Sequence, residues 1–250
     1  MGDTFALLSM LCFASNILIS RYAMARMPVD SGFFIILGTN IVAGLAFFVA
    51  ELALRTTPFV FRWKEAGLFV LGGVIGAFLG RRLLFDTVRL LGPARASVFH
   101  SCAPVPTLVF AWIVVGEMLG WYELALMAVV MAGLWITHPP QRDETISRAD
   151  RATLRRGMMF GLLTITGFGV SNALRGLAMR SWNEAICGAL LGGAAAFLMQ
   201  VLITRDWPRI IEGFRKGGRA GLLLYFASGL ATMGGAILII TAMNYMEIAL

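Results

Sequence analysis

Long apolar runs separated by short polar breaks dominate the chain, and their lengths predict its fold. A helix needs about 20 residues to cross the hydrocarbon core of a bilayer. The runs that reach this length cover residues 4–22, 32–54, 66–86, 94–115, 118–137, 157–178, 184–204 and 219–242. A ninth helix is expected to start near Glu247. The pattern predicts an all-α, polytopic transmembrane helical bundle with eight clear spanning helices.

The composition supports this prediction and excludes other classes of protein. The chain is 58% hydrophobic and 14% charged, whereas soluble domains are about 45–50% apolar and about 25% charged. Its net charge of +7 does not predict nucleic-acid binding, because basic residues gather in the loops of membrane proteins. The three cysteines lie inside apolar runs without a pairing pattern, so no disulfide framework, metal site or cofactor is predicted.

The two halves of the chain resemble each other. The pair Ser15-Asn16 in the first predicted helix matches Ser171-Asn172 in the sixth. The third and eighth predicted helices align without a gap, with Gly80 on Gly234. A repeat of five helices must insert in the opposite orientation the second time. Inverted repeats are typical of secondary transporters, whose substrate site lies near the middle of the membrane.

The repeat predicts the domain organisation. Residues 1–137 form the first five-helix repeat, and Pro139-Pro140 stops its last helix. Residues 138–156 are charged and are expected to be a linker. Residues 157–250 form the second repeat, which is expected to be C-terminally incomplete because no counterparts of the fourth and fifth helices follow.

Three features of the sequence resemble a known family. They are Ser15-Asn16, the Gly-rich third helix with its polar end, and a stretch running from Ala94-Arg95-Ala96-Ser97 through Pro104 and Pro106 to Gly116-Glu117. Together they resemble the drug/metabolite transporter superfamily, specifically its EamA-like members. The resemblance implies a multi-pass protein of the cell (cytoplasmic) membrane that exports or exchanges small metabolites, often with a coupling proton.

Ser15, Asn16, Ser171 and Asn172 are the first candidate site residues. They are small polar residues inside spanning helices, at equivalent positions of the two repeats. In one interpretation they join helices, since such side chains hydrogen-bond across helix contacts in membranes. In the other they line the central cavity and bind substrate. The two interpretations are compatible, and both stay open.

Charged residues at the end of the third helix form a second candidate site. Arg82, Asp86 and Arg89 share one face of a helix, so Asp86 is expected to pair with either arginine, while Arg81 points elsewhere. The matching positions in the eighth helix are uncharged, so the architecture alone does not require these charges. Arg81, Arg82 and Asp86 either bind an anionic group of the substrate or anchor the helix end at the interface.

His100 and Arg175 complete the candidate set. His100 lies in the fourth predicted helix, where it either packs or couples proton to substrate movement. Arg175 lies four residues after Ser171, on the same helix face. It is either a cavity cation or, as the sequence favours, a residue that reaches the headgroups. Tryptophans near helix ends, Trp182 among them, are expected to form interfacial belts.

The predicted function is secondary transport of small polar metabolites such as amino acids or organic anions, by alternating access. The alternative is a non-transporting membrane protein, or a remnant left inactive by the missing helices. No enzyme is predicted, because the chain has no HExxH, GxSxG or phosphate-binding motif. Basic residues concentrate in the loops at 21–26, 81–95, 142–156 and 205–219. The positive-inside rule places these loops in the cytoplasm, whereas the resemblance implies the reverse orientation.

Overall fold

In the computed structural model, the described residues are 2–92, 148–243 and shorter segments within 93–147, chiefly 102–110. Within them, six helices are long and apolar enough to cross a membrane. Five are α1 (Gly2–Met24), α2 (Val29–Leu54), α8 (Arg148–Ser181), α9 (Ala185–Ile203) and α10 (Trp207–Ala242). The sixth is a continuous run of α3 (Trp63–Gly72), the π-helical segment η1 (Gly73–Gly80) and α4 (Arg81–Leu91). A short helix, α6 (Pro104–Phe110), is also present.

The predicted all-α fold is confirmed for the described residues, and six of the eight predicted spanning helices are found there. The predicted helix at 118–137, most of that at 94–115 and the one expected near Glu247 lie outside the described residues. The inverted arrangement of the two repeats stays a prediction, as does the division at residues 137 and 157.

Two helices begin earlier than the hydrophobic pattern predicts. Helix α8 begins at Arg148 rather than near residue 157, so the last part of the predicted linker is helical. Its first turns are charged but rich in Arg and Ala, which favour helix without contributing hydrophobicity. Helix α10 begins at Trp207 rather than near residue 219, and its added part is likewise basic. Hydrophobicity alone finds only the apolar part of a helix.

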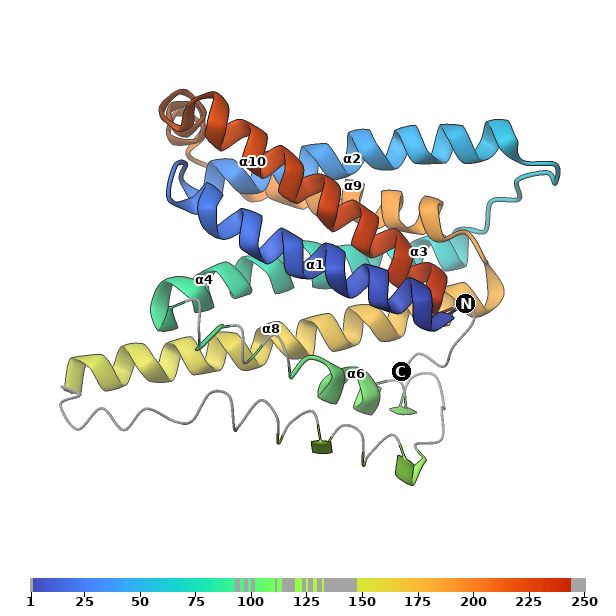
Figure 1. The fold of residues 1–250 in the computed structure, drawn as a ribbon, viewed down its shortest axis with the longest axis horizontal. Helices are drawn as coiled ribbons and strands as arrows, with labels where there is room; N and C mark the ends of the chain where they lie inside the picture. The colour runs from blue at the N-terminus through green and yellow to red at the C-terminus, as the bar shows by residue number, and fades with distance from the viewer. Residues whose placement is uncertain are drawn as a thin grey trace. The chain divides into compact units, whose positions relative to one another are not determined.

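The chain divides into two compact units, and the first contains residues 1–74 and 175–246. In this unit α10 packs against both α1 and α2, α9 packs against α2, and α3 packs against α9. Figure 1 shows α1 and α10 running side by side, with α2 and α9 next to each other. Small residues allow the closest approaches: a Cβ on Gly73 would overlap the backbone of Gly192. The core is a cluster around Phe69, Trp182, Met233 and Ile240.

The second unit contains residues 75–174 and includes most of α8. Helix α8 presents glycines to its neighbours here. A Cβ on Gly169 would lie 2.7 Å from the carbonyl carbon of Pro106, and one on Gly157 would lie 2.5 Å from Leu91. Ser171 of α8 packs directly on Gly76 of η1, where a side chain would overlap its Oγ. Small residues thus let α8 approach η1, α4 and α6 closely.

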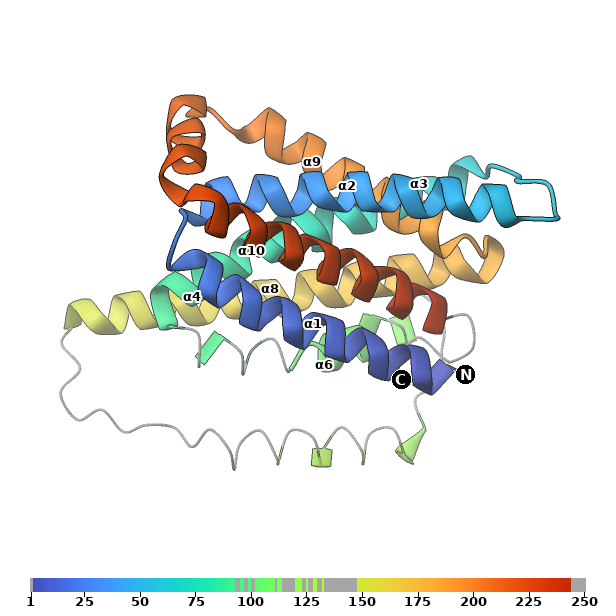
Figure 2. The same ribbon diagram turned by 45° about the horizontal axis from the view of Figure 1, so that its top comes forward.

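Helix α10 is bent sharply at Gly218. The backbone angles there, φ 58° and ψ −177°, belong to a region that essentially only glycine adopts. In Figure 1 the segment before the bend is seen end-on, whereas α1, α2 and the rest of α10 lie across the view; Figure 2 shows the same segment from the side. The segment 207–217 therefore runs across the direction of the spanning helices of its unit (Figures 1 and 2).

Candidate substrate-binding residues in the membrane

Ser15 and Asn16 have different surroundings in the structure. Asn16 Oδ1 accepts a hydrogen bond from Ser20 Oγ at 3.2 Å and another from Ser228 Oγ of α10. The hydroxyls of Ser20 and Ser228 are 2.8 Å apart, and both residues are buried. Ser15 lies on the exposed side of α1. Asn16 thus joins α1 to α10, which is the first of the two roles that the sequence allowed.

This polar contact continues along α10. Ser9 Oγ of α1 donates to the carbonyl oxygen of Gly235 at 3.0 Å. The side-chain amide of Asn40, on α2, faces the carbonyl oxygens of Gly229 and Ile36, and with its nitrogen assigned to that side it donates to Gly229 at 2.8 Å. Sequence analysis missed Ser9, Ser20, Asn40 and Ser228. The available signal was weak, because isolated serines are common in apolar helices and nothing in their spacing links α1 or α2 to α10.

The second pair, Ser171-Asn172, lies on α8 close to Arg175. Ser171 is buried against Gly76, so it lies at a helix contact. Asn172 is half-buried, and no hydrogen bond to its side chain is found among the described residues. It precedes Arg175 by three residues, so the two side chains share a face of α8. Asn172 and Arg175 therefore form a polar patch within the apolar, spanning part of α8.

Arg175 lies within the spanning part of α8. It is only partly exposed, and no hydrogen bond or opposite charge among the described residues engages its guanidinium. Arg180, five residues later, is exposed at the end of the helix. Five residues of helix rise about 7.5 Å, so Arg175 lies well inside the level at which Arg180 is placed. A guanidinium at this depth without a carboxylate can attract an anionic ligand.

The charges at the end of the third helix are arranged as a surface pair. Arg81 and Arg82 open α4, and Arg82 is exposed while Arg81 is half-buried. Asp86 Oδ1 lies 3.9 Å from Arg89 Nη1, and both side chains are substantially exposed. Of the two partners predicted for Asp86, the structure thus selects Arg89. The helix ends at Leu91 and is capped by Gly92, whose φ of 81° suits glycine. His100 lies outside the described residues.

A charged group that sequence analysis missed joins the end of α2 to the start of α9. Arg55 donates from Nη1 to Glu184 Oε2 at 2.9 Å and from Nη2 to Glu184 Oε1 at 2.5 Å. This hydrogen-bonded pairing raises the pKa of Arg55 above its usual value, with the nearby carboxylates adding to the effect. One carboxylate oxygen of Glu51 is buried nearby without a hydrogen-bond partner in the described part of the chain.

Trp182 does not belong to an interfacial belt, contrary to the sequence-based prediction. It is 4% exposed, and its Nε1 donates to the carbonyl oxygen of Val60 at 3.0 Å. Its ring packs edge-on against Phe61 and Phe69. The indole N–H finds a backbone partner in the loop between α2 and α3, which removes its need for water. Trp182 therefore holds this loop on the core of the first unit.

No group of three or more metal-binding side chains is found where the structure is described. Comparison with known families is more informative. The sequence model of the EamA-like transporter family matches residues 1–138, which is more than half of the chain. The chain belongs to the EamA-like transporter family. No match is found among curated proteins.

Membership in the EamA-like family agrees with the six apolar helices and makes this a multi-pass membrane protein of a transporter family. Family members are transporters rather than enzymes, and they act on small molecules across a lipid bilayer. The match covers α1, α2 and the run from α3 to α4, including Asn16, Arg81 and Asp86. Arg175 and Asn172 lie beyond it.

Proposed function

We propose that this EamA-like protein is a secondary transporter of the cytoplasmic membrane that exports or exchanges small polar metabolites with a carboxylate, such as amino acids or organic anions. It works by alternating access around a cavity near the middle of the membrane, as inverted-repeat transporters do. Arg175 binds the carboxylate of the substrate, and Asn172 adds a hydrogen bond from the same helix face. A coupling proton carried by His100 remains a prediction.

Arg175 is the observation that supports this proposal most. An arginine inside a spanning helix normally faces water or an opposite charge, because its insertion costs about 2.5–3.5 kcal/mol at the helix centre and less toward the ends. Arg175 lies six residues before the last residue of α8, off the centre of the span. Arg175 has no opposite charge in the described residues and is partly exposed. These properties fit a cation that lines a water-filled cavity and binds an anionic ligand there. Guanidinium is also well suited to bind a carboxylate through two parallel hydrogen bonds.

The other candidates support the proposal less directly. Asn16 already has two hydrogen-bond donors from neighbouring serines, and Ser171 is buried against Gly76. Ser15 and Arg82 are exposed, and Asp86 is paired with Arg89. In the proposed transporter, Asn16 and Ser171 hold helices together, while Arg81, Arg82 and Asp86 anchor α4, the last part of the third spanning run.

A counterflow experiment tests the proposal. The purified protein is reconstituted into liposomes that are loaded with single amino acids or organic acids, and uptake of the labelled compound is followed. Transport predicts saturable, protein-dependent uptake that only compounds with a carboxylate support. Folded protein that gives no uptake with any loaded compound would contradict the proposed function and favour a non-transporting role.

A further inference from the structure

The segment 207–217 of α10 has the features of a helix that lies in the plane of the membrane surface. It precedes the bend at Gly218 and runs across the direction of the spanning helices in its unit (Figures 1 and 2). Asp206 caps its start, accepting a hydrogen bond from the backbone N–H of Arg209 at 3.3 Å. A helix that runs across the spanning helices at one of their ends has the orientation of helices that lie in the membrane interface.

One face of this segment is fixed to the protein. Ser31 Oγ, at the start of α2, donates to the carbonyl oxygen of Ile210 at 3.0 Å, and Ile210 is buried. Gly213 lies against Ser31, and Gly217 lies against Met27, whose Cβ would be 2.8 Å from a Cβ at that position. These contacts hold the segment on the turn between α1 and α2. Packing against this turn therefore fixes which side chains of the segment point away from the protein.

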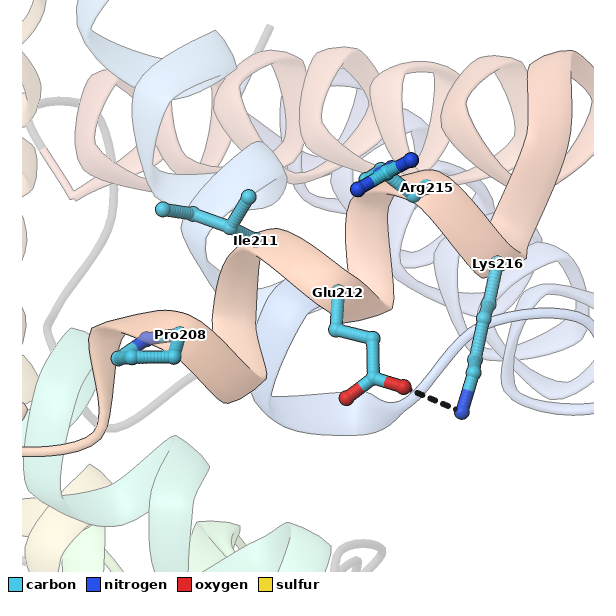
Figure 3. A pocket seen from close by; sticks show the side chains of 5 residues that line it. All are labelled: Pro208, Ile211, Glu212, Arg215 and Lys216. Carbon is cyan, nitrogen blue, oxygen red and sulfur yellow. Dashed lines mark ion pairs between the residues drawn. The ribbon is translucent and has the colours of Figure 1, made fainter.

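The exposed faces combine apolar and basic residues. Ile211 is 55% exposed, and Trp207 is 41% exposed although its ring lies 5.3 Å from that of Phe34. Figure 3 shows Arg215 on the same side of the helix as Ile211, with Glu212 and Lys216 on the other side. These residues and Pro208 line an open hollow of about 710 Å³. Exposed apolar side chains beside basic ones are typical of helices that bind a membrane surface.

The charges of the segment favour an anionic partner. Lys216 is paired with Glu212, Nζ to Oε1 at 2.6 Å. The side chains of Arg209 and Arg215 are exposed and have no ion pair with the described residues. Two cationic side chains thus remain for a partner: Arg215 beside the apolar Ile211, and Arg209 about 120° away around the helix. The positive-inside rule places the basic loops, including 205–219, in the cytoplasm, where the leaflet is anionic, whereas the family resemblance implies the reverse orientation.

We propose that the segment 207–217 is an interfacial helix that binds anionic phospholipid, with Arg209 and Arg215 contacting the headgroup phosphate and Ile211 and Trp207 lying among the acyl chains. This binding surface is separate from the proposed substrate site. Bound anionic lipid would strengthen the contact between α10 and the turn between α1 and α2, so the stability of this contact would depend on the lipid composition of the bilayer.

Native mass spectrometry of the full-length protein in detergent tests the proposal, with phosphatidylglycerol and phosphatidylcholine as probes. The wild-type protein is expected to bind phosphatidylglycerol in preference to phosphatidylcholine. Each basic residue near an anionic surface contributes about a fivefold preference. Arg215→Gln should therefore reduce the preference about fivefold, and Arg209→Gln with Arg215→Gln by more than about tenfold.

Lys64→Gln is the matched control, because Lys64 is an exposed cation at the start of α3, beyond the opposite end of α2. It should leave the preference unchanged. Thermal unfolding of each variant checks that these exposed substitutions leave the protein folded. An unchanged preference in the double variant, or an equal loss in Lys64→Gln, would overturn the proposal. Displacement of phosphatidylglycerol by millimolar inorganic phosphate would also overturn it, since it would indicate a site for a free anion.

Discussion

Arg55 and Glu184 form a two-point ion pair that connects the end of α2 to the residue preceding α9. The donor–acceptor distances are 2.9 and 2.5 Å, and a third guanidinium nitrogen, Nε, donates to Thr57 at 3.1 Å. The side chain of Glu184 is 8% exposed and that of Arg55 is 22% exposed. The guanidinium also lies 5.7 Å from the centre of the Phe59 ring. The pair thus fixes the loop that follows α2.

Removing either partner of this pair is expected to destabilise the protein, but the loss of Arg55 should cost more than the loss of Glu184. Arg55→Gln leaves the buried carboxylate of Glu184 without its cation, next to the charge of Glu51, so it should lower the thermal unfolding temperature strongly. Glu184→Gln should be milder, since Glu51 still attracts Arg55. Lys216→Gln breaks an exposed pair and should change little. If all three substitutions lowered the unfolding temperature equally, the claim that a buried ion pair contributes more to stability than an exposed one would be contradicted.

Asn16 and Ser15 offer a direct comparison of two adjacent polar residues. Asn16→Ala removes the acceptor for Ser20 and Ser228, and hydrogen bonds between membrane helices contribute about 0.6 kcal/mol on average and up to about 1.7 kcal/mol. Ser15→Ala alters only an exposed position. The free energy of unfolding in mixed detergent should therefore fall for Asn16→Ala alone. A larger loss for Ser15→Ala would show that its exposed face is covered by another part of the chain.

Gly73 and Gly67 make a similar comparison along one spanning run. A Cβ at Gly73 would lie 2.6 Å from the carbonyl carbon of Gly192, and backbone atoms cannot rotate away, so Gly73→Ala should cost about 1–3 kcal/mol. A Cβ at Gly67 meets nothing within 4 Å. Gly67→Ala should be neutral or stabilise by about 0.4–1 kcal/mol. Thermal unfolding in detergent measures both, and a tolerated Gly73→Ala would contradict the close contact between η1 and α9.

The sequence predicts the spanning helices well because the bilayer imposes a length and a composition on them. Helix α9 was expected at 184–204 and is found at Ala185–Ile203. The helical segments at 148–156 and 207–217 were missed because they are charged and lie outside the apolar runs. Hydrophobicity alone does not reveal the charged part of a helix.

Side-chain partners were harder to predict than helices. Arg55 and Glu184 are separated by 129 residues and lie at helix ends, where charged residues are usually solvated. Trp182 has the position of an interfacial residue in the sequence, but the loop after α2 folds over it. The pairing of Asp86 with Arg89, in contrast, follows from helical spacing and was among the expected alternatives. Local spacing predicts contacts within a helix, whereas contacts between helices depend on packing.

The transport activity of Arg175 variants tests the central claim most directly. Counterflow of a carboxylate-bearing substrate, once found, is compared for the wild-type protein, Arg175→Gln and Arg180→Gln in liposomes with equal amounts of folded protein. We expect Arg175→Gln to raise the apparent KM by at least about tenfold or to abolish uptake, because it removes a charge-assisted contact worth about 1.5–3 kcal/mol. Arg180→Gln, which changes an exposed residue at the helix end, should transport normally. Unchanged uptake by Arg175→Gln would contradict the account.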